Sequence, residues 1–390
     1  MPTVEKSTVV AKIRPVAPGS IANKSQSAST SHLPALDGLR GLAIALVLIT
    51  HCENALHWTP QSDFFVKAVH KVVCFSTCGV DLFFVLSGFL ITGILLRSKN
   101  SANYFKSFYV RRALRIFPLY YLALALIWCG IKIWGEPPDA LMGMPADRTW
   151  LWFYGTNILM TLRHTWTYSS LNHFWSLAVE EHFYLVWPFL VMALETGPLL
   201  WFCLAAVPAS LLIRAAFVYP LHNELAAYVL TICRVDSLLI GCFIAIVAYL
   251  RGPEILKRSA VAVALGMAVL VPIFIGVVPH ASNTDRIWGP TIFALLFASL
   301  LVLTLTRTEC KHFFENRVLR VLGKYSYGLY IYHFIVIVGL EHLWSWNALP
   351  PVPNYLLFLF VASACSMLIA VTSYQLYEVH FLKLKKYFQA

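Results

Sequence analysis

Two residues in the first apolar segment have types and a spacing suited to acid–base chemistry, Arg40 and His51. On an α-helix, eleven residues return His51 to within about 20° of Arg40, roughly three turns and 16 Å further along the same face. Histidine titrates near neutrality and is the commonest general base. The spacing therefore predicts a base inside the first helix and a guanidinium at its entrance. A packing histidine beside an ordinary basic helix end fits the same pattern, so both interpretations stay open.

A second candidate is the pair Glu180 and Glu181, which begins a long apolar run. Consecutive residues on a helix point about 100° apart, so at most one carboxylate faces a given partner. One of them can orient and stabilise the imidazole of His51, as the acid of a catalytic triad does. The alternative is a hydrated charge cluster at the membrane surface.

A third group is Arg111, Arg112 and Arg115, just before Pro118. Their i,i+3 and i,i+4 spacings gather guanidinium groups at a helix entrance. Planar guanidinium forks suit phosphate recognition, so these arginines, together with Arg40, are candidates to bind a phosphate-bearing cofactor. The alternative is the basic composition of any cytoplasmic loop.

Other polar residues lie inside apolar runs, where ionisable groups are costly and often functional. Asp81 is placed to meet an arginine on another helix, whereas Arg234 and Asp236 can form a structural charge pair. Hydroxyl groups are expected to support the site, three of them as candidate oxyanion donors (Ser87, Tyr327 and Tyr330) and one, Ser326, in the segment that leads to His333.

These residues need a membrane scaffold. The 390-residue chain is 59% apolar and only 13% charged, with a mean hydropathy of +0.68, whereas soluble proteins carry about a quarter charged residues. We therefore predict an all-α polytopic membrane protein, and the hydropathy argues against a nucleic-acid partner despite the net charge of +11. A span needs about 20 apolar residues. This length predicts ten spans, near residues 37–57, 73–96, 112–134, 176–194, 198–218, 229–250, 259–279, 287–307, 320–343 and 355–378.

The loop charges predict the topology of the ten helices. With the N-terminus inside, 20 of the 30 Lys and Arg residues fall in cytoplasmic segments and 7 in outer segments, as the positive-inside rule requires. Both termini are therefore expected in the cytoplasm, residues 1–32 as a disordered tail and 381–390 as a short basic tail. Residues 150–160 form a shorter aromatic stretch, expected to be interfacial or re-entrant.

The nine cysteines form no C-x-x-C pair and mostly lie in apolar runs. They predict neither a disulfide framework nor a zinc site, and we expect no metal and no permanently bound cofactor.

Five segments, in this order along the chain, resemble motifs of the membrane-bound acyltransferase family 3. They are Leu36-Asp37-Gly38-Leu39 with Arg40 and His51, Gly79-Val80-Asp81-Leu82-Phe83-Phe84, Arg111-Arg112-Ala113-Leu114-Arg115, Trp175-Ser176-Leu177-Ala178-Val179-Glu180-Glu181, and Tyr325-Ser326-Tyr327-Gly328-Leu329-Tyr330. The resemblance covers residues 33–380, the expected membrane acyltransferase domain. One departure is His182, where the family often has Gln.

The resemblance implies a bacterial inner-membrane O-acyltransferase. Such an enzyme transfers an acyl group, often acetyl, from the co-substrate acyl-CoA (acetyl-CoA) on the cytoplasmic side to a hydroxyl of a carbohydrate or glycosylated acceptor. By the same resemblance His51 is the catalytic histidine, Arg40 its motif partner, and Arg111, Arg112 and Arg115 belong to the donor side. Many relatives carry a further periplasmic hydrolase-like domain. In this protein the transfer is expected to be completed by the membrane domain alone or by a separate periplasmic protein.

Two chemical routes stay open, direct attack of the hydroxyl on the thioester and an acyl-histidine intermediate. A different class, a proton-coupled transporter or flippase of lipid-linked sugars, also uses intramembrane His, Glu and Arg.

Overall fold

Apolar runs of this length fold as α-helices because a helix satisfies every backbone donor and acceptor within its own segment. The computed structural model describes residues 33–56, 59, 62–134, 145–341, 343–344 and 349–388, and this part of the chain contains no strand. The expected tail 1–32 lies outside the described residues. From Pro34 onward the chain forms one compact unit.

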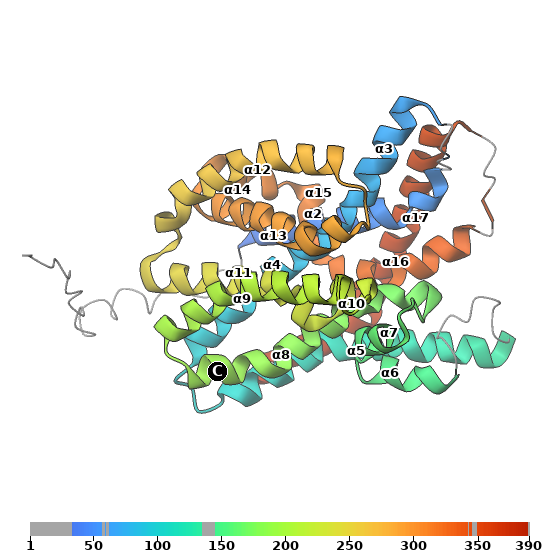
Figure 1. Ribbon diagram of the computed structural model, residues 1–390. Helices are drawn as coiled ribbons and strands as arrows, with labels where there is room; N and C mark the ends of the chain where they lie inside the picture. Colours follow the sequence, from blue (N-terminus) through green and yellow to red (C-terminus); the bar gives the residue numbers. More distant parts are fainter. Residues whose placement is uncertain are drawn as a thin grey trace, which may run out of the picture. The chain divides into compact units, whose positions relative to one another are not determined.

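The helices, shown in Figure 1, are α2 (Pro34–His51), α3 (Phe64–Phe75), α4 (Gly79–Ser98), α5 (Tyr104–Trp134), α6 (Arg148–Trp152), α7 (Thr156–Arg163), α8 (Trp175–Ala193), α9 (Thr196–Val218), α10 (Glu224–Val229), α11 (Thr231–Arg251), α12 (Lys257–Val277), α13 (Asn283–Thr306), α14 (Thr308–Phe314), α15 (Arg317–Lys324), α16 (Ser326–Glu341), α17 (Pro351–Ser373) and α18 (Val379–Leu384). Short segments of other helix types lie between or after them: η1 (Glu53–Leu56), η2 (Ser76–Cys78), η3 (Pro145–Asp147), η4 (Ser169–Phe174), η5 (Pro253–Leu256), η6 (Tyr374–Glu378) and η7 (Lys385–Tyr387).

The described helices confirm a polytopic membrane protein. Eight helical segments are long and apolar enough to cross a membrane, and each overlaps one of the predicted spans. A ninth candidate is the pair α15 and α16, predicted as one helix over 320–343 but bent by 76° at Tyr325. The predicted span 176–194 forms a helix, α8, that is not among the eight, because Glu180, Glu181 and His182 interrupt its apolar run. The count of ten and the placement of the termini stay predictions.

The short stretch at residues 150–160 does not form a spanning helix. Two short helices, α6 and α7, occupy it and join at Tyr154, which has a positive φ of 54°.

Several helix pairs approach so closely that only glycine fits between them, among them α2 with α15 and α4 with α11. A Cβ atom on Gly41 of α2 would lie 2.0 Å from the carbonyl oxygen of Leu319 on α15, and one on Gly88 of α4 would lie 1.9 Å from that of Leu238 on α11. Small residues at such crossings let helices pack backbone to backbone within membranes. These contacts hold α2 and α4, which carry Arg40, His51 and Asp81, at the centre of the bundle.

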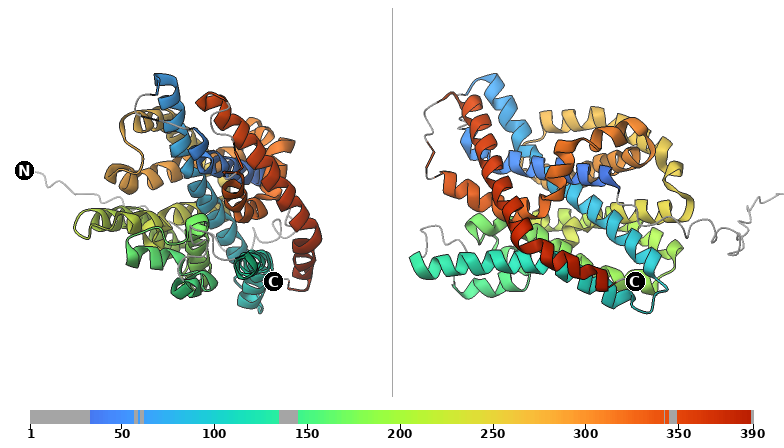
Figure 2. Two further views of the ribbon diagram at one scale, coloured as in Figure 1. Left: turned by 90° about the vertical axis from the view of Figure 1, so that its right-hand side faces the viewer. Right: turned by 180° about the vertical axis from the view of Figure 1, so that it is seen from behind.

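The C-terminal segment crosses the molecule (Figure 2). Helix α17 continues through the π-turn η6 into α18 and η7, and the Ser107 hydroxyl of α5 donates a hydrogen bond to the Phe388 carbonyl (3.0 Å). The expected tail 381–390 is therefore helical from Phe381 to Leu384 and ends on α5, with residues 389–390 outside the described part.

The close crossings predict a stability effect. We expect Gly41→Ala and Gly88→Ala each to lower the free energy of unfolding by about 1–3 kcal/mol, because the added methyl group must push a helix backbone aside. The matched control is Gly266→Ala, since a Cβ there would meet nothing within 4 Å and alanine favours the helix by up to about 1 kcal/mol. Thermal unfolding of the detergent-solubilised protein measures the difference. Equal stability of all three variants would contradict the packing described.

Candidate active site

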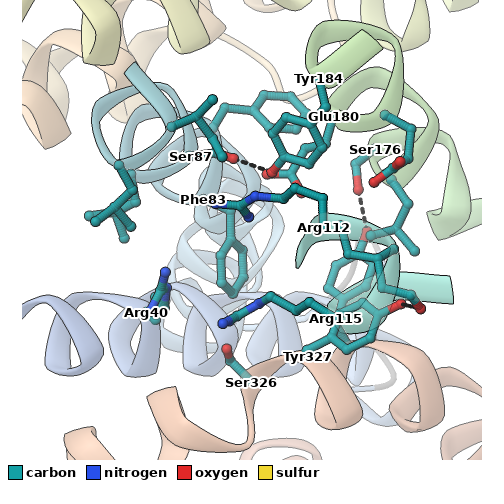
Figure 3. Close-up of a pocket in the computed structure, with 18 of the residues that line it drawn as sticks. Arg40, Phe83, Ser87, Arg112, Arg115, Ser176, Glu180, Tyr184, Ser326 and Tyr327 are labelled. Atoms are coloured by element: carbon teal, nitrogen blue, oxygen red, sulfur yellow. Dashed lines mark hydrogen bonds between the residues drawn. The ribbon is translucent and has the colours of Figure 1, made fainter. Parts of the chain in front are cut away.

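Three of the predicted arginines converge on one cavity. Arg40 comes from α2, and Arg112 and Arg115 come from α5. We call this space, of about 100 Å³, the arginine cavity. Figure 3 shows the three guanidinium groups pointing toward a common centre around Phe83. Its other walls are formed by α4, α8 and α16, through residues that include Ser87, Leu90, Ser176, Glu180, Glu181, Tyr184, Ser326, Tyr327 and Tyr330.

Carboxylates and an aromatic ring lie close to the cations of this cavity. Arg40 pairs with Asp37 one turn earlier (Nη1–Oδ1, 3.1 Å), and Arg112 stacks over the ring of Tyr184 at 5.2 Å. The charge of Arg112 also interacts with those of Glu180 and Glu181. A further cation was not predicted as part of the site: Lys385, on η7, lies close enough for its charge to interact with those of Arg40, Arg111, Arg112 and Arg115.

Arg111 differs from its two neighbours. Its side chain is exposed and does not line the arginine cavity. The reason is helical geometry, since Arg111 points about 100° away from Arg112. The predicted group of four arginines therefore contributes three to the cavity wall.

Both predicted glutamates line the arginine cavity. Glu180 lies beside Ser87 and Tyr184, whose hydroxyl groups are hydrogen-bonded to each other (Figure 3). The hydroxyls of the other two candidate oxyanion donors are engaged with the backbone, Tyr327 donating to the Ile116 carbonyl (2.6 Å) and Tyr330 to the His173 carbonyl (2.7 Å). Neither glutamate contacts His51, so the described residues do not form the predicted glutamate–histidine pair.

His51 instead lies in a cluster of histidines. It is the last residue of α2, and its ring centroid lies 4.9 Å from that of His333 of α16, with the two ring planes 29° apart. The ring of Phe334 lies 5.2 Å away, and that of His173, in η4, 6.2 Å away. His51, His173 and Phe334 line a second, larger space of about 500 Å³, which we call the histidine cavity; its other walls include Glu53, Asp81, Trp166, Trp175, Tyr228, Arg234, His280, Asp285 and Arg286.

Hydrogen bonds define the tautomers of this pair. The Leu329 carbonyl can only accept, so His333 carries its proton on Nδ1, which lies 3.0 Å from that oxygen. Its Nε2 is then an acceptor, and His51 Nδ1, 2.9 Å away, is the donor. The remaining ring nitrogen of His51, Nε2, therefore has a free lone pair. A neutral histidine with a lone pair on Nε2 and a partner on Nδ1 has the arrangement of a general base.

The two cavities are separated by a wall one side chain thick. Tyr330 lines the arginine cavity, and its ring centroid lies 5.3 Å from His173 and 5.7 Å from His333. Phe84, also in the arginine cavity, packs edge-on against Trp175 of the histidine cavity at 6.2 Å. Helix α2 passes this wall, so Arg40 lies on one side and His51 on the other.

Two buried ion pairs connect helices around the site. Arg234 of α11 binds Asp81 of α4 (Nη2–Oδ1, 2.7 Å), and Ser237 donates to the same oxygen at 3.0 Å. This confirms the prediction that Asp81 meets an arginine on another helix. The predicted pair Arg234–Asp236 is wrong, because residues two apart on a helix face opposite sides.

Asp236 pairs instead with Arg214 of α9 (2.9 Å), and both side chains are fully buried. Arg214 also donates to the Ile287 carbonyl (2.8 Å), so α9, α11 and α13 meet there. Arg214 was not among the site residues predicted from the sequence. Its position inside an apolar run was the signal that would have identified it.

Fold and cavities thus describe a multi-pass helical membrane protein with two adjoining polar cavities. A family model described as "Acyltransferase domain" matches residues 33–371, so the chain belongs to this family and the family predicted from the motifs is confirmed.

The chain is similar to proteins of two species. It is 27% identical to the peptidoglycan O-acetyltransferase OatA of Listeria monocytogenes over 79% of this chain and 50% of that protein. It is 26% identical to the O-acetyltransferase OatA of Staphylococcus aureus (strain NCTC 8325 / PS 47) over 83% of this chain and 53% of that protein. The chain spans about half the length of these curated relatives. No solved structure matches it.

The buried ion pairs predict a second stability effect. Asp236→Ala should lower the free energy of unfolding by about 3–5 kcal/mol, because it leaves the Arg214 charge buried and unpaired. The double variant Arg214→Met with Asp236→Ala should regain much of that loss. As a control, Glu254→Ala breaks the exposed pair Lys257–Glu254 and should cost less than about 1 kcal/mol. Thermal and denaturant unfolding in detergent measure all three, and similar effects for Asp236→Ala and Glu254→Ala would refute the assignment.

Proposed function

We propose that this protein is an inner-membrane O-acyltransferase that transfers an acyl group, often acetyl, from cytoplasmic acyl-CoA to a hydroxyl of a carbohydrate or glycosylated acceptor. The observation that carries the proposal is the pair of cavities along α2, one with guanidinium groups and one with a histidine base. Membership of the acyltransferase domain family and the similarity to O-acetyltransferases support it.

The arginine cavity suits the donor. Arg40, Arg112 and Arg115 offer charge-assisted hydrogen bonds to the phosphates of coenzyme A, and guanidinium forks fit phosphate oxygens. Lys385 adds a further cation. Beyond the arginines the wall becomes apolar through Phe83, Leu90 and Ile91, so the pantetheine arm can extend from the phosphates toward the wall at Tyr330. Glu180 and Glu181, which line the same cavity, limit its net positive charge.

The histidine cavity suits a hydroxyl acceptor. Its volume of about 500 Å³ and its mixture of aromatic rings with a few polar groups are typical of small-molecule sites. Trp166, Trp175 and Tyr228 offer ring faces, while Asp285 and Arg286 offer hydrogen-bonding groups. Such a lining fits a sugar, which presents apolar faces and hydroxyl edges.

The chemical step follows from the His51 tautomer. His51 Nε2 removes the proton from the acceptor hydroxyl, whose oxygen forms a bond to the thioester carbonyl carbon. The C–S bond then breaks, and the coenzyme A thiolate takes the proton back from His51. His333 Nε2 accepts the Nδ1–H bond throughout, which keeps the imidazole oriented and stabilises its cationic form. His333 thus takes the positioning role that the sequence assigned to Glu180 or Glu181. The competing acyl-histidine route uses the same Nε2 as the nucleophile.

The proposed donor site predicts that neighbouring arginines differ in their effect on the KM for acetyl-CoA. In transfer assays with labelled acetyl-CoA and purified protein, Arg112→Ala and Arg115→Ala should each raise the KM for acetyl-CoA by about 10-fold or more, since a hydrogen bond to a charged group contributes about 1.5–3 kcal/mol. Arg111→Ala is the matched control and should leave the KM within about 2-fold, because its side chain lies outside the cavity. An equal effect of all three, or none, would contradict the donor assignment.

The proposed base, His51, predicts an effect on kcat and little effect on the KM for acetyl-CoA. His51→Ala should lower kcat by about 10²–10⁴-fold with the acetyl-CoA KM little changed. His333→Ala should also lower kcat, and His333→Gln should regain part of it, because an amide oxygen can accept the Nδ1–H bond. Undiminished transfer by His51→Ala would exclude the proposed base. Labelled protein formed before acceptor is added would favour the acyl-histidine route, and sugar movement in vesicles without consumption of acyl-CoA would indicate a transporter.

A further inference from the structure

Three side chains of different chemistry converge just beyond His51. Glu53 lies in η1, and His70 and Cys74 lie one turn apart on α3. The Cys74 thiol donates a hydrogen bond to Glu53 Oε2 at 3.2 Å, and its sulfur lies 3.5 Å from His70 Nε2. One ligand atom from each of the three residues falls within 4.8 Å of the others. None of these residues takes part in the proposed chemical step.

These separations match the edges of a metal coordination tetrahedron. With zinc–sulfur bonds of about 2.3 Å and zinc–nitrogen bonds of 2.0–2.1 Å, sulfur and nitrogen ligands lie about 3.6 Å apart. The Cys74–His70 and Cys74–Glu53 distances, 3.5 and 3.2 Å, are close to this value. The ligand atoms of all three residues lie within 4.8 Å of one another. The sulfur lies 3.8 Å from His70 Nδ1 as well, so the imidazole ring must turn to direct its Nε2 lone pair at a cation placed among the three.

The donor set identifies the class of metal. A thiolate, an imidazole and a carboxylate together suit a borderline-soft divalent ion, and Zn²⁺ takes all three. The i,i+4 spacing of His70 and Cys74 places both on one face of α3. We propose that Glu53, His70 and Cys74 bind one Zn²⁺ ion. On binding, the thiol proton that Cys74 now donates to Glu53 is released, leaving a thiolate and a carboxylate that neutralise the ion.

The location of this site gives it a structural role. Glu53 follows His51 by two residues and also lines the histidine cavity, so a metal bound to it would fasten the end of α2 to α3. Three protein ligands leave a fourth position for water. The half-buried side chains of Glu53 and His70 give the ion access. The cysteine spacings predicted no zinc site because the ligands come from two separate segments and only one is a cysteine.

Zinc binding to the full-length protein in detergent tests the proposal. Protein stripped with a chelator is titrated with Zn²⁺ in competition with a chromophoric chelator, and one equivalent should bind. Cys74→Ser and His70→Ala should each weaken binding by about 10-fold or more. The matched control is the double variant Cys310→Ser with His312→Ala on α14, which removes the same two residue types from a place where they point to different sides, and it should bind as the wild type does.

A second readout keeps the proposal testable if a variant is destabilised. Co²⁺ bound in place of Zn²⁺ to the wild-type protein should give a thiolate-to-metal charge-transfer band, and Zn²⁺ should raise the unfolding temperature of the stripped wild type. Absence of the band in the wild type, its persistence in Cys74→Ser, or equal weakening by the α14 variant would overturn the proposal. None of these measurements depends on acyl transfer, so the zinc site and the enzymatic function can fail separately.

Discussion

Burying charge among apolar helices is costly, because a charge taken out of water must find another charge or a polar cavity. The structure meets this requirement in three ways. Arg214–Asp236 and Arg234–Asp81 are closed ion pairs that join helices. The guanidinium groups of Arg40, Arg112 and Arg115 line a cavity together with two glutamates. His51 and His333 can remain neutral because each donates its Nδ1 proton to a defined acceptor. The pair Arg214–Asp236 lies outside both cavities, whereas Arg234–Asp81 also lines the histidine cavity, so one ion pair is structural and the other forms part of the candidate site.

Helix α2 connects these parts. Its glycine-mediated crossing with α15 brings the two helix backbones together, and its two ends present Arg40 and His51 to different cavities. Helix α16 contributes in the same way, with Ser326, Tyr327 and Tyr330 on the arginine side and His333 on the histidine side. The bend at Tyr325 directs α16 so that its residues reach both cavities. This bend, which the sequence did not predict, therefore helps to form the site. Tyr330 lies between the two sides, in the wall of the arginine cavity and in contact with His173 and His333.

Much of the fold could be predicted because a membrane helix can be recognised from the apolar residues of its own segment. Eight predicted spans overlap long apolar helices. Arg111, Arg112 and Arg115 were identified as one basic group from helical spacing, and two of them, with Arg40 of α2, line the arginine cavity. Asp81 was correctly expected to meet an arginine from another helix. The failures concern partners: Asp236 was paired with its neighbour Arg234, a glutamate was paired with His51, and Arg214 and His173 were overlooked.

The sequence by itself determined which segments are helices and which residues of each helix share a face, because these depend on side chains three or four positions apart. Tertiary structure alone decided which faces meet. His51 and His333 are separated by 282 residues and Arg234 and Asp81 by 153, so no local pattern relates them. Their contacts follow from backbone approach at glycines and from the bend before Ser326. The same packing decided that Glu180 and Glu181 line the arginine cavity, and it brought Glu53 to His70 and Cys74.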